Sequence, residues 1–133
     1  GTSRHDLNSS EYLHKIHNIS FSPAPHFDLE EEFNLQQKLA QLIRNKTIAS
    51  AHDVSEGGVF VTLTESGFNR DLGYDIVTNK TVRKDAFLFG EAQSRVIVTV
   101  KESQVSAFKK QIGNHPDRPR SVASWNRDSR CAG

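Results

Sequence analysis

The chain has 133 residues, of which 35% are hydrophobic, so it is long enough for one domain with a modest core. Its 17 Lys and Arg residues nearly balance 16 Asp and Glu residues, which argues against a dedicated nucleic-acid-binding protein with a basic face. No apolar run is long enough to cross a bilayer and no signal-peptide pattern opens the chain, so we expect neither nucleic acid nor membrane as a partner.

The cysteine content and the first residues bear on the setting of the chain. Cys131 is the single cysteine, so no internal disulfide can form and a cytoplasmic location is expected. The Asn-x-Ser/Thr sequons at Asn18, Asn45 and Asn79 are then interpreted as chance matches. Gly1-Thr2-Ser3 resembles a cloning remnant, and we interpret residues 1–5 as remnant or linker and the rest as a domain from a larger protein.

Residues 6–27 are expected to form a short leading helix and a connector. Ser9 or Ser10 can cap a helix through about His17. Pro23 and Pro25 then force extended backbone.

Residues 28–113 are expected to form an α+β domain, which begins with a helix over residues 28–45. Asp28 can cap this helix, and the glutamates at 30–32 suit the helix dipole, which explains them more simply than a metal site does. A stripe of apolar residues indicates its buried face: Leu29, Phe33, Leu35, Leu39, Leu42 and Ile43.

A short strand over residues 47–53 is expected to lead into a polar turn. Asp53 or Ser55 can cap a following helix, and Gly57 and Gly58 allow a ligand to approach the backbone closely. Residues 59–64 are ambiguous. Their β-branched content favours a strand, whereas their place after a capped glycine pair favours a helix, and the residues alone lean narrowly to a strand.

The second half continues the mixture of helices and strands. Strands are expected over residues 73–78 and 96–100, a turn or short helix over 81–86, and a helix over 102–112. After Gly113 the periodic pattern ends, although residues 122–125 could form a very short strand. Residues 114–133 are interpreted as an atypical tail that is solvated or disordered. This order predicts helices packed on a mixed sheet.

Several kinds of catalytic or binding site are excluded. One cysteine cannot build a multi-thiolate zinc site. His52 and Asp53 are neighbours on a strand and point to opposite faces, so they cannot form a relay with each other. The chain also has no Gly-x-x-x-x-Gly-Lys-Ser/Thr phosphate loop.

Two polar turns remain as candidates for a binding site, at residues 52–58 and 90–95. Glu91 and Gln93 can hydrogen-bond a polar ligand, and Gly57 and Gly58 can offer backbone N–H groups to an anion. The alternative is structural: Glu91 forms an ion pair with Arg95, and Asp53 only caps the helix. Both interpretations stay open.

The two polar turns lie in two longer motifs, Ala51-His-Asp-Val-Ser-Glu-Gly-Gly58 and Phe87-Leu-Phe-Gly-Glu-Ala-Gln-Ser-Arg-Val96. Both motifs resemble the last domain of the phosphoribosylformylglycinamidine synthase family, whose members are purine-biosynthesis enzymes. The motifs at residues 8–13 and 22–29 resemble the segment leading into that domain. The likeness covers about residues 6–112.

The resemblance implies a fold and a place in a larger enzyme. The family belongs to a superfamily with aminoimidazole ribonucleotide synthetase, and this chain resembles the C-terminal domain of the second repeat, a three-layer arrangement of a mixed β-sheet flanked by helices. In the family, a helix follows the glycine pair, so we predict a helix over residues 59–64. The ATP-binding residues and the catalytic histidine belong to other domains, so a fragment that is inactive alone is expected.

The resemblance also implies ligands and partners. The full enzyme uses ATP and Mg²⁺ and takes ammonia from glutamine, so the remaining domains and a glutaminase domain or subunit are the expected partners. Neither a catalytic residue nor a metal ligand is assigned in this chain. The residues that match a substrate or nucleotide pseudo-site are Asp53, Ser55, Gly57, Gly58, Glu91 and Gln93. The competing hypothesis is a module that packs against neighbouring domains without binding a ligand.

The tail departs from the family pattern. After about Gly113 a further strand pair and a closing helix are expected, but residues 117–133 have an unrelated composition. It is therefore open whether the last strand of the sheet forms. A missing strand would leave an unpaired edge, which favours self-association into a homodimer.

Overall fold

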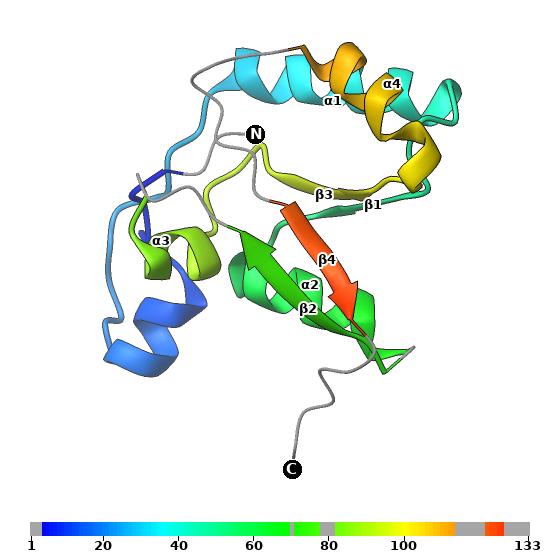
Figure 1. Cartoon of the computed structure of the whole chain (residues 1–133). Helices are drawn as coiled ribbons and strands as arrows, with labels where there is room; N and C mark the ends of the chain where they lie inside the picture. The colour runs from blue at the N-terminus through cyan, green and yellow to red at the C-terminus, as the bar shows by residue number, and fades with distance from the viewer. Residues whose placement is uncertain (1–3, 70, 78–81, 114–121, 127–133) are drawn as a thin grey trace.

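The computed structural model describes residues 4–69, 71–77, 82–113 and 122–126. Helices and strands alternate along the chain (Figure 1). In order they are η1 (Tyr12–Ile16), α1 (Leu29–Arg44), β1 (Ser50–Asp53), α2 (Gly58–Phe68), β2 (Gly73–Val77), α3 (Lys84–Phe89), β3 (Val96–Thr99), η2 (Glu102–Gln104), α4 (Val105–Ile112) and β4 (Val122–Asn126). The predicted α+β class is confirmed.

The strands form two antiparallel pairs. β1 pairs with β3, with Asp53 opposite Val96, and β2 pairs with β4, with Val77 opposite Val122. The expected single mixed sheet needs a correction, because the described strands make no parallel pair. β1 and β2 follow each other through α2, yet each takes its hydrogen-bonding partner from later in the chain.

The elements are arranged in layers around the β1–β3 pair. In Figure 1, α1 and α4 lie above this pair and α2 lies below it, with β2 and β4 in front of α2. The side chains of Thr47 and Gln111 are hydrogen-bonded at 3.1 Å and join the end of α1 to α4. This order agrees with the helix–sheet–helix layers that the resemblance implied.

The core forms where α2 meets its neighbours. Val54, Val59, Leu63 and Phe87 are buried together. Val59 and Leu63 are four residues apart on α2, so a helix puts both on its buried face. The helix predicted from the resemblance is confirmed, and the β-branched content of residues 59–64 is overridden by this burial.

The two N-terminal helices begin at hydrogen-bonding side chains. Asp28 caps α1, because its Oδ1 accepts the N–H of Glu31 at 2.9 Å. Ser10 is buried at the start of the leading helix, where its hydroxyl accepts the N–H of Leu13 and donates to the carbonyl of Leu7. This leading helix has π-type hydrogen bonding over Tyr12–Ile16.

The apolar stripe predicted for α1 is only partly buried. Leu42 is 4% exposed, but Leu29, Phe33 and Ile43 are more than half exposed. The described residues thus leave part of this stripe uncovered.

A strand forms inside the atypical tail. β4 pairs along its whole length with β2, which answers the question of whether a strand forms there. The rest of the tail, residues 114–121 and 127–133, lies outside the described residues. Within the described part of the chain, no helix combines the length and apolar character that spanning a membrane requires.

Candidate functional site

The two polar turns lie against each other. The N–H of Val54 donates to the carbonyl of Arg95 at 3.0 Å, which extends the pairing of β1 with β3. Gly58 packs against the second turn so closely that an added Cβ would lie 2.6 Å from the carbonyl oxygen of Leu88 and 2.8 Å from that of Gly90. The structure thus places the two candidate turns side by side.

Glu91 links three segments through one oxygen. Its Oε1 accepts the backbone N–H of Gly57 at 2.9 Å and that of Glu11 at 2.8 Å. Gly57 precedes α2, and Glu11 opens the leading helix. The carboxylate therefore fastens the leading helix and the start of α2 to the second turn.

Both glycine N–H groups already have partners in the protein. Gly57 donates to Glu91, and Gly58 donates to the carbonyl of Ser55 at 3.0 Å. Both glycines have positive φ angles, +77° and +66°, which favour glycine over other residues. An anion at this turn would have to displace internal hydrogen bonds, so the anion role of Gly57 and Gly58 stays a prediction.

Asp53, Ser55 and Gln93 have exposed side chains. The expected capping by Asp53 or Ser55 is wrong, because the N-cap of α2 is Gly57 and no side chain caps it. Ser55 lies two residues before that N-cap and contributes only its carbonyl. Within the described residues these three side chains make no hydrogen bond or ion pair, so they are the predicted site residues that remain available to a ligand.

Arg95 is buried and bonds to backbone carbonyls. Its Nη1 donates to Gly90 O at 2.8 Å and its Nη2 to Phe87 O at 3.0 Å, at the C-terminal end of α3. Burial lowers the pKa of Arg95 to about 10. The alternative ion pair between Glu91 and Arg95 is wrong, because each side chain bonds to a different part of the backbone.

A contact between α1 and the second turn was missed by the sequence reasoning. The hydroxyl of Ser94, which has a φ of +63°, donates to Glu32 Oε2 at 2.7 Å. This bond, with a smaller contribution from Gln36, lowers the pKa of the Glu32 carboxyl. Glu32 was assigned only to the helix dipole, and its 62-residue separation from Ser94 left no local signal for the contact.

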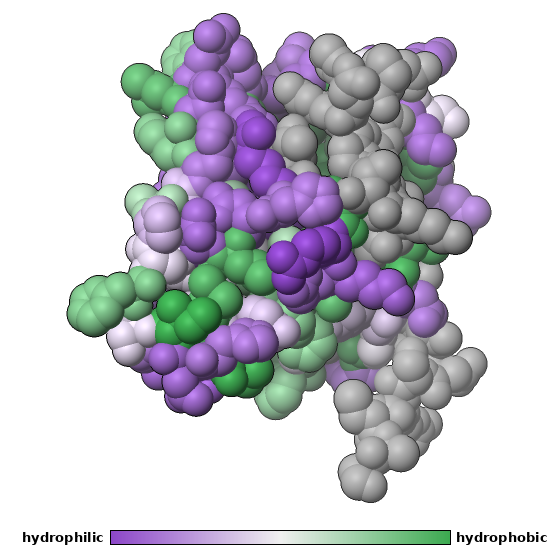
Figure 2. Space-filling view, turned by 90° about the vertical axis from the view of Figure 1, so that its left-hand side faces the viewer, coloured by the Kyte–Doolittle hydropathy of each residue, from purple (hydrophilic) through white to green (hydrophobic). Residues whose placement is uncertain are grey.

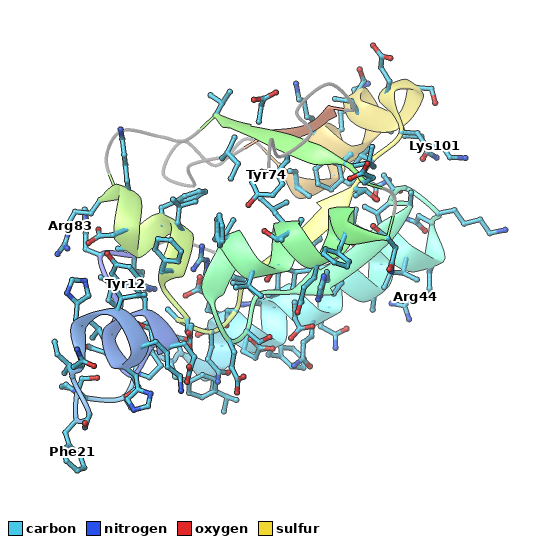
Figure 3. The ribbon with its side chains drawn as sticks, turned by 90° about the horizontal axis from the view of Figure 1, so that it is seen from below. Tyr12, Phe21, Arg44, Tyr74, Arg83 and Lys101 are labelled. Carbon is cyan, nitrogen blue, oxygen red and sulfur yellow. The ribbon has the colours of Figure 1, made fainter. Side chains whose placement is uncertain are left out.

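An aromatic stack was also missed. Tyr12 lies parallel to Phe89 with ring centroids 4.6 Å apart, and Phe89 lies 5.5 Å from Phe60. Tyr12 comes from the leading helix and reaches the end of α3 (Figure 3). The stack therefore strengthens the connection that Glu91 makes between the leading helix and the domain.

The donor set does not fit a magnesium ion in the part of the chain that the structure describes. No group of three or more His, Cys, Asp and Glu side chains is placed there to hold a metal. Mg²⁺ in proteins is usually bound through carboxylates together with substrate phosphates. No step is therefore assigned to a metal at these turns.

Comparison with known sequences identifies the family. The family described as AIR synthase related protein, C-terminal domain, matches residues 1–119. The chain belongs to this family. The match includes both polar turns, so the Glu91 link and the packed glycine pair are features of an AIR synthase related C-terminal domain.

Several similar proteins carry the same name. The phosphoribosylformylglycinamidine synthase subunit PurL of Salinibacter ruber is 43% identical over 107 residues, which cover 80% of this chain and 14% of that protein. The proteins of the same name from Alkaliphilus metalliredigens and Caldanaerobacter subterraneus subsp. tengcongensis are 33% and 35% identical over 84% and 86% of this chain. The resemblance found in the motifs is confirmed, and this AIR synthase related domain spans only 14–16% of the length of these relatives.

Proposed function

We propose that the chain is a domain of a phosphoribosylformylglycinamidine synthase, in the position of the C-terminal domain of the second repeat. Similarity to PurL subunits over most of this chain supports the proposal. In that enzyme formylglycinamide ribonucleotide, ATP and ammonia from glutamine give formylglycinamidine ribonucleotide, ADP and phosphate. The reaction is an ATP-dependent formation of a carbon–nitrogen bond in the cytoplasm.

The catalytic groups of this reaction are proposed to lie outside the chain. ATP and Mg²⁺ would bind to the other domains, and ammonia would come from a glutaminase domain or subunit. The isolated chain would then be inactive, and its partners would be the remaining domains of the enzyme. The homodimer was predicted for the case in which no strand forms in the tail. β4 does form there, and a homodimer of the chain stays a separate prediction.

The role proposed for this domain is structural, and one observation carries it. Glu91 is the strongest polar candidate in the two turns, yet its Oε1 is bonded to the backbone of Gly57 and Glu11. A carboxylate that satisfies two backbone donors stabilises the fold. We therefore infer that the turns position the leading helix, which precedes the domain in the chain, relative to the helix and strands of the domain.

A ligand-binding role is the second candidate, and exposed side chains favour it. The side chains of Asp53, Ser55 and Gln93 face solvent in the two turns and make no hydrogen bond or ion pair with the described residues. A ribonucleotide or nucleotide could bind through these side chains without disturbing the bonds of Glu91. The two roles are thus assigned to different residues, which makes them separable.

Steady-state kinetics on the full-length synthase separate the two roles. For the structural role, Glu91→Gln lowers the melting temperature but leaves kcat and KM unchanged well below that temperature, and Asp53→Asn and Gln93→Ala change neither property. For the ligand role, Asp53→Asn or Gln93→Ala raises KM with an unchanged melting temperature. The double variant Asp53→Asn/Glu91→Gln should keep its kinetics if the structural role is correct.

Calorimetric titration gives an independent answer. The folded chain is titrated with formylglycinamide ribonucleotide and, separately, with Mg-ADP. The structural role predicts no heat of binding with either compound. Binding that is abolished by Asp53→Asn would instead establish a ligand site in this domain.

A further inference from the structure

The N-terminal segment and the start of α1 carry a set of exposed apolar side chains, which we name the apolar edge. Phe21 is 94% exposed and Leu29 is 73% exposed. The apolar edge consists of Ile16, Ile19, Phe21, Phe27, Leu29 and Phe33. Figure 2 views the molecule from the side along which this segment runs in Figure 1, and hydrophobic atoms gather there among hydrophilic ones. Exposed apolar sets of this kind mark interaction surfaces.

Hydrogen bonds within the N-terminal segment join its first residues to its last ones. Ser9 N donates to Ser22 Oγ at 2.6 Å, and Ser9 Oγ donates to Pro23 O at 2.9 Å. Further along, Asp6 Oδ2 accepts the N–H of His26 at 2.7 Å. Phe21 and Phe27 are therefore each next to a residue whose backbone or side chain is fixed, and their exposure is a property of the folded segment.

An ion pair fixes the other end of the apolar edge. Arg4 Nη2 lies 3.0 Å from Glu31 Oε2, between Leu29 and Phe33 in sequence. Leu29 and Phe33 are four residues apart on α1 and so share a helix face. The glutamates between them, with Lys15 near Ile16, supply charged residues around the apolar ones. An apolar centre with a polar rim is the usual composition of a protein interface.

We propose that the apolar edge is the docking surface for another domain of the same synthase polypeptide, one that presents an apolar face of its own. This inference rests on the proposed function. The relatives are far longer than this chain, which covers only 14–16% of each, so most of a homologous polypeptide is available to cover the surface. Phe21 is the most exposed residue of the apolar edge, and an aromatic side chain on a fixed backbone loses little conformational entropy on binding.

Hydroxyl-radical footprinting of the 133-residue chain and of the full-length synthase tests the proposal. The oxidation rate of Phe21, Phe27 and Phe33 is expected to fall roughly fivefold or more in the full-length protein, because an interface core excludes solvent. Phe68, which is 80% exposed at the end of α2, is the matched control and should keep its rate. Equal oxidation of Phe21 in both proteins would overturn the proposal.

A second copy of the chain is the competing occupant. Sedimentation of the 133-residue chain, with footprinting across the same concentration range, detects it. Protection of Phe21 that grows with dimer formation would assign the surface to self-association and overturn the proposal. A monomer that stays fully oxidised at Phe21 supports it.

The test of the docking surface can fail independently of the test of the proposed function. Activity of the full-length protein with formylglycinamide ribonucleotide reports on function, whereas footprinting reports only on coverage of the surface. Protection of Phe21 in a protein without this activity would support the docking surface and contradict the function. An active full-length protein in which Phe21 is not protected would support the proposed function and contradict the docking surface.

Discussion

The carboxylate of Glu91 accepts the backbone N–H of Gly57 at 2.9 Å across 34 residues of sequence. The same oxygen accepts the N–H of Glu11, 80 residues away in the chain. One side chain thus joins the leading helix, the glycine turn and the strand-entrance turn. The two motifs that made the chain recognisable are held together by this contact, so a structural constraint accounts for part of the pattern in the sequence.

Removing the Glu91 carboxylate should destabilise the domain. Glu91→Ala leaves two backbone donors without an acceptor and should lower the free energy of unfolding by about 2 to 3 kcal/mol, whereas Glu91→Gln keeps one neutral acceptor and should lower it by about 1 kcal/mol. Urea denaturation gives these values. Glu56→Gln, on an exposed residue of the first turn, is the control and should have no effect. Hydrogen exchange at Gly57 and Glu11 should accelerate in Glu91→Ala, and unchanged exchange would contradict the link.

Alanine variants of Gly58, Gly90 and Gly113 distinguish the cost of steric crowding from the cost of backbone strain. Gly113 has a φ of +72°, and no described residue lies within 4 Å of a Cβ added there. Gly90 has an ordinary φ, but an added Cβ would lie 2.4 Å from Ala86 O. Gly58 combines a positive φ with this crowding. Gly113→Ala should cost about 1 to 3 kcal/mol from strain alone. Gly58→Ala should cost more than that, since the crowding atoms are backbone and cannot move aside. Thermal or urea unfolding of the three variants ranks them, and a Gly58→Ala protein as stable as Gly113→Ala would refute the close packing.

Acid should selectively remove the contribution of Glu32. The Ser94 hydroxyl and the Gln36 amide lower the pKa of Glu32 in the folded state below its ordinary value of 4.5. A lowered carboxyl pKa stabilises the folded state above about pH 4.5, and this stabilisation is lost as the pH falls through the folded value. Because Glu32 is close to solvent, Glu32→Gln should cost only about 0.5 kcal/mol at pH 7, with the difference from wild type shrinking below pH 4.5.

The control for this titration is Glu30→Gln, which removes the same charge from the same helical turn. It keeps the bond between Ser94 and Glu32, so the pH-dependent difference should persist in that background. A difference between wild type and Glu32→Gln that is constant from pH 3 to pH 7 would show that the bond with Ser94 has no energetic effect.

Local sequence patterns predicted the helices and strands, but they did not predict contacts between residues that are distant in sequence. The cap at Asp28 and the strands at Gly73–Val77 and Val96–Thr99 follow from residue type and spacing, which act over a few residues. The sequence also singled out the two turns as candidates for a binding site. It could not show that Glu91 bonds to Glu11, because such a contact depends on how distant segments pack.

Helix α2 shows why propensity alone was insufficient. Residues 59–64 are rich in β-branched residues, and the residues alone leaned to a strand, but Val59 and Leu63 gain burial only on a helix face. The pairing of the strands was likewise beyond local signals, since each strand of the first half pairs with one from the second half. The partial exposure of the α1 stripe escaped prediction for a related reason: apolar periodicity shows which face a helix can bury, but not how much of that face the neighbouring segments cover.

The buried guanidinium of Arg95 should be essential for stability at all pH values near neutrality. Arg95→Met removes the donors to Gly90 O and Phe87 O and leaves two carbonyls unpaired, which should cost about 2 to 4 kcal/mol. Burial lowers the pKa of Arg95 to about 10, so below that pH both the folded and the unfolded states hold the proton and the cost should not vary between pH 6 and pH 8. Arg83→Met is the control, because the Arg83 side chain is exposed and pairs with nearby Asp85, and it should change stability by less than about 0.5 kcal/mol. Urea denaturation at three pH values measures both variants, and a cost for Arg95→Met equal to that of Arg83→Met would mean that the two carbonyls gain nothing from the guanidinium.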